Sequence, residues 1–111
     1  MRMYAELVAE LKALQNLPFA ENEWATRPAC DHGTVQIDFD AAQDSGDDHH
    51  ADRAKQGSID LYTHGRGTDK AAAVEEILER ICESSWYLNL ESYEHETGLL
   101  HREYVFELEA L

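Results

Sequence analysis

The stretch 86–108 reads WYLNLESYEHETGLLHREYVFEL, and it contains two runs in which apolar and polar residues alternate. Such alternation predicts β-strands with one face against a core and one face in water, because successive side chains point to opposite faces. Gly98 punctuates the short connection between the runs. We therefore predict an antiparallel hairpin of strands 86–94 and 99–109. Its apolar rows are Trp86, Leu88, Leu90 and Tyr104, Phe106, Leu108.

Two further alternating runs precede the hairpin, at 34–40 and 58–63, and a short extended piece is expected around Trp24. The polar positions of all four runs carry mostly carboxylates, so the exposed side of the predicted sheet is acidic. These acids are Asp38, Asp40, Asp60, Glu91, Glu103, Glu107 and Glu109.

Two segments, 3–16 and 69–84, carry apolar residues at helical spacing, which predicts amphipathic helices. Leu17-Pro18 is expected to end the first helix, and Thr68 or Asp69 to cap the second. The predicted core combines these helices with the apolar strand rows. Its members are Leu7, Leu11, Leu14, Val35, Ile37, Ile59, Leu61, Val74, Ile77, Leu78, Ile81, Trp86, Leu88, Tyr104, Phe106 and Leu108.

The order of these elements predicts an α+β fold: a mixed, mainly antiparallel sheet of about four strands, with two helices packed on one face. At 111 residues the chain is expected to form a single domain, 1–111. Residues 41–56 have no apolar period and are rich in acids and histidine, so we expect an exposed acidic loop there.

The net charge of −14 restricts the partners that this chain would bind. Nucleic acid and anionic lipid both attract basic surfaces, so we expect neither direct nucleic-acid binding nor membrane association. No run approaches the length of a membrane span, and the start lacks the apolar core of a signal peptide. A basic protein partner fits the charge.

The acidic loop contains the weak metal-ligand candidates Asp44, Asp47, Asp48 and His49. An EF-hand template that starts at Asp38 fails, since its sixth position is Gln43 instead of glycine and its twelfth is His49 instead of glutamate. We expect a solvated loop and no cofactor, with a weak divalent-cation site as the open alternative. Contact with partner proteins is predicted for Asp47, Asp48, His49, His50, Asp52, Tyr87 and Tyr93.

No arrangement of residues indicates catalysis. Asp38 and Asp60 would be cross-strand neighbours, but a paired carboxylate on a wet face lacks the desolvated cleft that acid–base chemistry needs. Cys30 and His32 are near in sequence without a nucleophile motif. We therefore expect a protein that is not an enzyme.

One family resemblance rests on residues 52–78 together with the order of elements. The residues are Asp52, the strand Ser58-Ile59-Asp60-Leu61-Tyr62-Thr63, the helix start Asp69-Lys70 with Val74, Ile77 and Leu78, an upstream Trp24 and Pro28, and a final strand with Tyr104-Val105-Phe106. The chain in these features resembles the small tail-terminator, or tail-completion, proteins of long-tailed bacteriophages and prophages.

The resemblance implies a structural tail protein of the virion that is assembled in the bacterial cytoplasm. It would form a homo-oligomeric ring, usually a hexamer, that caps the tail tube and joins it to the head connector. The proteins of the tail tube and the head connector would then be its partners. The loop at 41–56 is more acidic and richer in histidine than the family pattern.

A second function remains open from the charge alone. An acidic domain of this size is typical of inhibitors that mimic DNA and bind a basic nuclease of a host or competitor. Self-association into a ring would favour the tail protein, and a monomer that binds a nuclease would favour the mimic.

Overall fold

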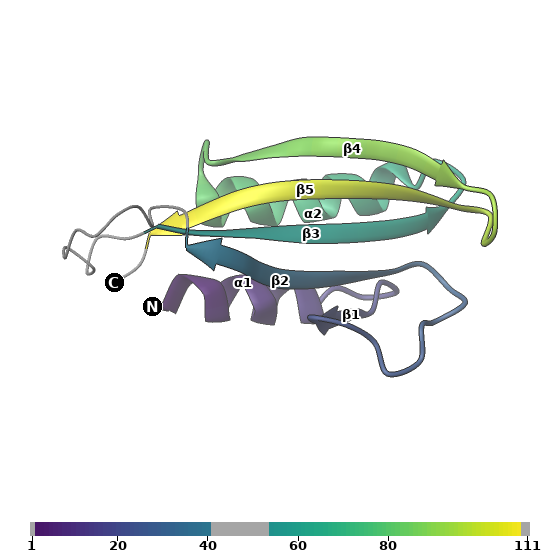
Figure 1. Cartoon of the computed structure of the whole chain (residues 1–111), viewed down its shortest axis with the longest axis horizontal. Helices are drawn as coiled ribbons and strands as arrows, with labels where there is room; N and C mark the ends of the chain where they lie inside the picture. Colours follow the sequence, from purple (N-terminus) through teal and green to yellow (C-terminus); the bar gives the residue numbers. More distant parts are fainter. Residues whose placement is uncertain (1, 41–53, 110–111) are drawn as a thin grey trace.

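The computed structural model describes residues 2–40 and 54–109, in which two helices and five strands form (Figure 1). The helices are α1 (Arg2–Lys12) and α2 (Thr68–Cys82). The strands are β1 (Phe19–Glu21), β2 (His32–Asp40), β3 (Ala54–His64), β4 (Trp86–Glu94) and β5 (Leu99–Glu109).

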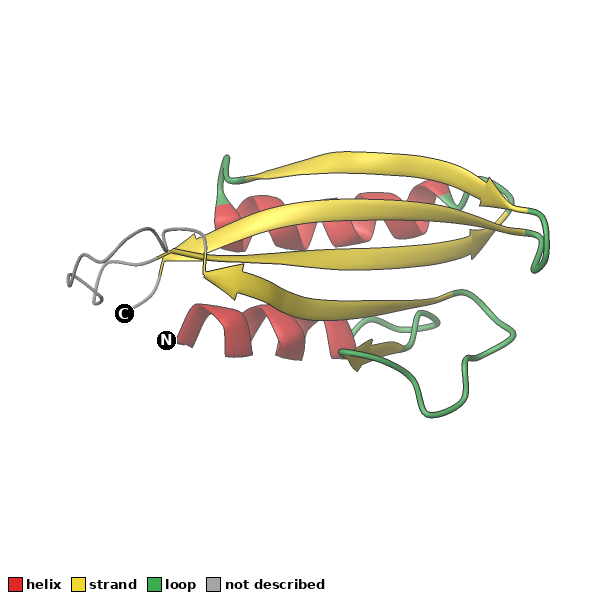
Figure 2. Cartoon of the chain, viewed as in Figure 1, coloured by secondary structure: helices red, strands yellow, loops and turns green. Residues whose placement is uncertain are grey.

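The strands form one sheet in the order β1-β2-β3-β5-β4. Only β1 and β2 run parallel, and the other neighbours are antiparallel. Both helices lie on the same face of the sheet (Figure 2). The predicted α+β fold and the β4–β5 hairpin are therefore confirmed, and the short β1 raises the strand number from about four to five.

The core lies between the helices and the sheet. Leu7 and Leu11 of α1 and Val74 and Leu78 of α2 are fully buried, because each helix turns its apolar stripe toward the strands. Most of the predicted core is buried, whereas Leu14, Ile37, Ile81 and Trp86 are partly buried against it. Buried hydrophobic residues outside the prediction are Leu17, Phe19, Ala71, Cys82 and Leu99.

The prediction for β4 was partly wrong, because the alternation along this strand breaks. Leu88 lies opposite Tyr104, but Leu90 lies opposite Glu103, so a bulge at Asn89 shifts the register by one residue. Leu88 is 42% exposed and does not belong to the core. The same shift turns Glu91 to the helix side, where its carboxylate lies 2.9 Å from Nε of the buried Arg102.

Several element boundaries also differ from the prediction. The helix α1 ends at Lys12 instead of 16, and the short extended piece is β1, which precedes Trp24. Residues 54–56 belong to β3 and not to a loop, while 41–53 lie outside the described residues. Neither Thr68 nor Asp69 caps α2: the cap position is Gly67, which adopts a left-handed conformation and has no side chain to bond.

Candidate functional site

The face of the sheet away from the helices, here called the open face, carries a row of aromatic rings. His32, Tyr62 and His101 lie directly opposite one another on β2, β3 and β5. Their ring centroids are 4.9 Å and 4.5 Å apart, with interplanar angles of 18° and 13°. Trp24 meets His32 edge-on at 6.3 Å. Cross-strand pairing thus builds a continuous stack across three strands.

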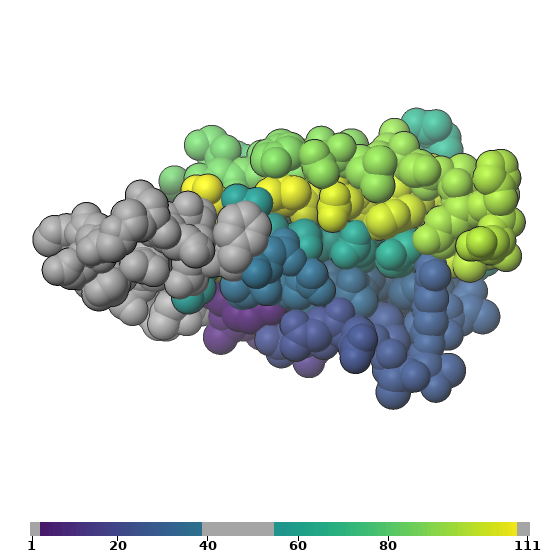
Figure 3. Space-filling model, in the orientation of Figure 1, coloured from purple at the N-terminus to yellow at the C-terminus, as the bar shows by residue number. Residues whose placement is uncertain are grey.

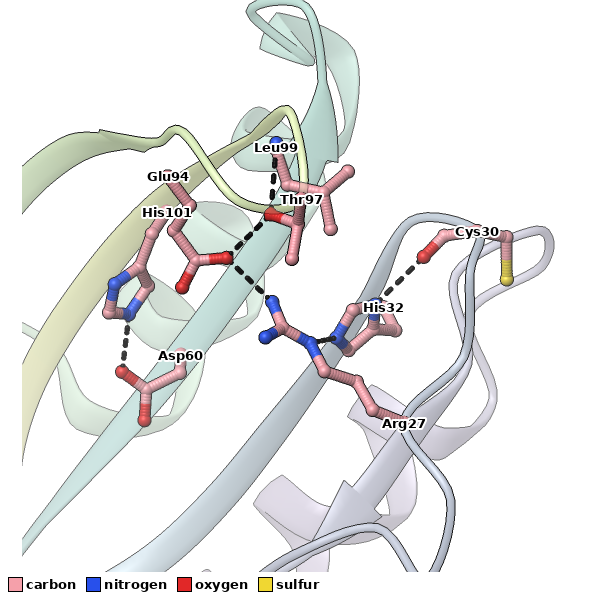
Figure 4. A network of polar contacts seen from close by, with 8 residues as sticks. All are labelled: Arg27, Cys30, His32, Asp60, Glu94, Thr97, Leu99 and His101. Atoms are coloured by element: carbon pink, nitrogen blue, oxygen red, sulfur yellow. Dashed lines mark hydrogen bonds and ion pairs between the residues drawn. The ribbon is translucent and has the colours of Figure 1, made fainter.

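The segment 22–31, here called the strap, connects β1 to β2, and its Arg27 and Trp24 side chains contact this ring row. The guanidinium of Arg27 sits 4.2 Å from the centroid of Tyr62, in cation–π geometry. Its Nε donates to Nε2 of His32 at 3.0 Å, and its Nη2 donates to Glu94 at 2.9 Å (Figure 4). Arg27 therefore joins the strap to three separate strands.

His32 is 1% exposed, and its two hydrogen bonds define its tautomer. The Cys30 carbonyl, 2.7 Å from Nδ1, only accepts, so Nδ1 carries the proton. Arginine only donates, so Nε2 is unprotonated and accepts from Arg27. Burial lowers the pKa of His32, and the charge of Arg27 lowers it further against the opposing effect of the Cys30 bond. His32 is a neutral imidazole held between a carbonyl and a cation.

Asp31 anchors the C-terminal end of the strap to the end of β3 and to the first turn of α2. Its carboxylate accepts from Nζ of Lys70 at 2.7 Å and from the backbone N–H of His64 at 2.9 Å, and the His64 ring lies 2.7 Å away. Burial acts to raise the pKa of Asp31, but the bonds from Lys70 and His64 outweigh it and leave this pKa lowered. The strap is thus tied down at Arg27 and at Asp31.

A groove of about 340 Å³ opens beside the strap. Its polar walls include Asp60, which also lies 2.7 Å from Nε2 of His101. These ionic and aromatic groups bond mainly to one another, so the arrangement holds chain segments together. The lining residues are Asn22, Glu23, Trp24, Arg27, His32, Thr34, Gln36, Asp60 and Tyr62.

The second candidate surface follows β4, the edge strand at the opposite side of the sheet (Figure 3). Among residues 3–38 and 55–108, every exposed large hydrophobic side chain lies on this strand: Tyr87 and Tyr93 are 55% exposed, and Leu88 and Leu90 are 42% exposed. These four residues are here called the β4 surface. An exposed apolar edge of this kind is typical of a protein interface.

The predicted contact residues Tyr87 and Tyr93 are thus both accessible, but on opposite faces. Tyr87 pairs with Val105 and belongs to the open face, whereas Tyr93 pairs with Leu100 on the helix side, beyond the bulge. A single flat partner surface could therefore not contact both rings through one face of the sheet. The candidates Asp44, Asp47, Asp48, His49, His50 and Asp52 lie outside the described residues.

The other sequence candidates are not brought together. Asp60 lies opposite Thr34, and Asp38 accepts from the Gln36 amide at 2.7 Å, so the two carboxylates are not cross-strand neighbours. Cys30 contacts His32 through its backbone carbonyl instead of its thiol. In the described ranges there is no group of three potential metal-binding side chains, and no helix there has the length and apolar character of a membrane span.

Sequence reasoning missed Arg27 and the ring row. His101 and Tyr62 occupy polar positions of alternating runs, which was a usable signal that both face the same side. The register that aligns them with His32 depends on pairing across three strands. That pairing is not encoded in any local pattern.

Comparison with known proteins gives structural neighbours but no family. No protein-family model matches the chain, and no curated protein matches it in sequence. One solved structure aligns with a TM-score of 0.60 and 11% identity over 96% of this chain and 95% of its own. A chain from the virion of a native gene transfer agent particle aligns with a TM-score of 0.54 and 14% identity over 96% of this chain and 90% of its own. At these identities, what is shared is the fold.

Proposed function

We propose that this chain is a structural subunit of a phage-like particle, and more specifically a tail-terminator-like protein. In this role, copies of the chain form a ring that caps the tail tube and joins it to the head connector. The β4 surface supplies a contact between neighbouring subunits or with an adjacent virion protein. The proposed role is structural rather than catalytic.

The observation that carries this proposal is the fold shared with a virion chain of a gene transfer agent particle over nearly the full length of both chains. The β4 surface supports it independently, since four large apolar side chains on an edge strand favour burial against another protein. The mutual pairing of Arg27, His32 and Glu94 is what a rigid assembly subunit needs.

The ring should depend on salt, because a charge of −14 on each subunit opposes closure. The Debye length falls from about 10 Å at 0.1 M salt to roughly 3 Å at 1 M, so high salt screens this repulsion. Negative-stain electron microscopy of the purified chain at both salt concentrations tests the proposal. Rings at high salt support it, and a monomer at every salt and magnesium concentration contradicts it.

The alternative, a DNA-mimic inhibitor, is favoured by the acids of the open face. Asp60, Glu103 and Glu107 project from this face, and the described residues of β3, β4 and β5 place no lysine or arginine on it beside them. Isothermal titration against basic nucleases distinguishes the two functions. Tight binding of a nuclease by a monomer would replace the tail-protein proposal.

A further inference from the structure

The contact between Arg27 and His32 works in one protonation state only. Nε of Arg27 is a permanent donor, and it points at the lone pair on Nε2 of His32 from 3.0 Å. Protonation of His32 adds a hydrogen to Nε2, which removes the acceptor. It also places an imidazolium directly against a guanidinium. One proton therefore converts a hydrogen bond into a repulsive contact.

The surroundings of His32 stabilise a positive charge on its ring poorly. The ring is 1% exposed and stacks on Tyr62 of β3, while Trp24 closes its edge. Two carboxylates are near enough to favour the charged ring, Asp31 beside it and Glu94 of β4. Each of these carboxylates already accepts hydrogen bonds from basic groups.

The part of the strap around Trp24 and Arg27 depends on the same contact, whereas Asp31 holds its other end to Lys70 and His64. The Arg27 guanidinium bridges from His32 to Glu94 and covers Tyr62, and Trp24 Nε1 donates to the carbonyl of Gly33 at 3.2 Å. Displacement of Arg27 would uncover Tyr62 and loosen Trp24. The ring row would then become accessible on the open face beside the 340 Å³ groove.

We propose that the strap is a proton-operated clasp: it is closed while His32 is neutral and is released when His32 binds a proton. Release exposes the stacked rings of the open face at acidic pH. Burial and the charge of Arg27 lower the pKa of His32, so the clasp stays closed at neutral pH and opens below the ordinary value of 6.5. This inference depends neither on the assembly of subunits into an oligomeric ring nor on the proposed tail role.

A Trp86→Phe background makes Trp24 the only tryptophan and thus a reporter of the strap. Its fluorescence is followed from about pH 7.5 to about pH 4.5, which spans the histidine range and stays above the usual aspartate range. The His32 ring is followed by NMR over the same titration. We expect one transition of Trp24 that coincides with His32, and faster amide exchange in 22–31 below it. A Trp24 signal that ignores His32 protonation overturns the clasp.

Two variants sharpen the test. In His32→Gln the side-chain amide oxygen can accept from Arg27 and its NH₂ can donate to the Cys30 carbonyl. Because this amide does not titrate, the clasp stays closed at acidic pH and the Trp24 fluorescence transition is lost. His95→Gln, at an exposed histidine in the turn between β4 and β5, is the matched control and keeps the transition. Arg27→Gln, at an exposed position, removes a charge that lowers the pKa of His32, so the midpoint pH of the His32 titration rises toward 6.5. This variant stays informative if His32→Gln fails to fold, and an unchanged midpoint contradicts the coupling.

Discussion

The two edges of the sheet differ in how far other parts of the chain protect them. At one edge, the short β1 pairs with residues 33–35 of β2, the strap continues from it, and Phe19 places its ring over Gly33. At the other edge, β4 leaves Tyr87, Leu88, Leu90 and Tyr93 exposed. An edge strand that a protein protects with its own chain has no need of a partner, whereas an apolar uncovered edge does. The difference indicates which side of the subunit is built for assembly.

The bulge at Asn89 adds to this contrast. A bulge twists an edge strand and interrupts regular pairing, so β4 is a poor template for uncontrolled strand addition. The same bulge distributes apolar side chains to both faces, with Leu88 on the helix side and Leu90 on the open face. We infer that a partner contacts β4 mainly through side chains.

The largest expected difference is between two identical substitutions. Leu78 is fully buried beneath the sheet, so Leu78→Ala should lower the free energy of unfolding by about 2–5 kcal/mol. Leu88 is 42% exposed, so Leu88→Ala should cost about 1 kcal/mol or less in the monomer. Urea unfolding at low salt measures both. Equal losses would mean that the β4 edge is part of the monomer core.

The protected edge should be sensitive to a single methyl group. A Cβ on Gly33 would lie 2.5 Å from the Phe19 ring and 3.0 Å from the Asp60 carbonyl, so Gly33→Ala must displace the ring. We expect a loss of about 1–3 kcal/mol in unfolding free energy. In a Phe19→Leu background the same change should cost less. An equal loss of unfolding free energy in both backgrounds would mean that Gly33→Ala does not act through the Phe19 ring of β1.

The anchor of the strap at Asp31 should give a smaller, pH-dependent effect. The pKa of Asp31 is lowered from 3.8, so its stabilisation is complete above that value and is lost as the pH falls through the folded-state pKa. Asp31→Asn should cost about 1–2 kcal/mol at neutral pH, because Lys70 and His64 are partly exposed. Urea unfolding near neutral pH and in acid should show the difference shrinking. A difference between wild type and Asp31→Asn that does not change with pH would mean that the variant loses packing and not a charge interaction.

The sequence was sufficient for elements with a clear local period. The helix stripe from Val74 to Ile81 and the strands 86–94 and 99–109 were predicted closely, because burial on one face leaves a readable pattern. Such a pattern needs no knowledge of distant residues. It therefore also gave the correct fold class.

The parts that were missed depend on tertiary contacts. The bulge at Asn89 has no marker such as glycine, and it turned Leu90 to the open face. The cap of α2 is Gly67, since the tight turn after β3 determines how the helix starts. The site around His32 requires Arg27 to reach Glu94, 67 residues away in the chain. No local spacing encodes such a contact, and only the assembled sheet brings the two together.

Sedimentation velocity in about 1 M salt, where repulsion is screened, tests the central claim that the β4 edge is built for assembly. The wild-type chain should sediment as a closed oligomer, and Leu90→Asp should sediment as a monomer with an unchanged fold. Gln15→Asp adds the same charge at an exposed site away from β4 and should still assemble. A Leu90→Asp variant that assembles as well as the wild type, or a wild type that stays monomeric, would contradict the account.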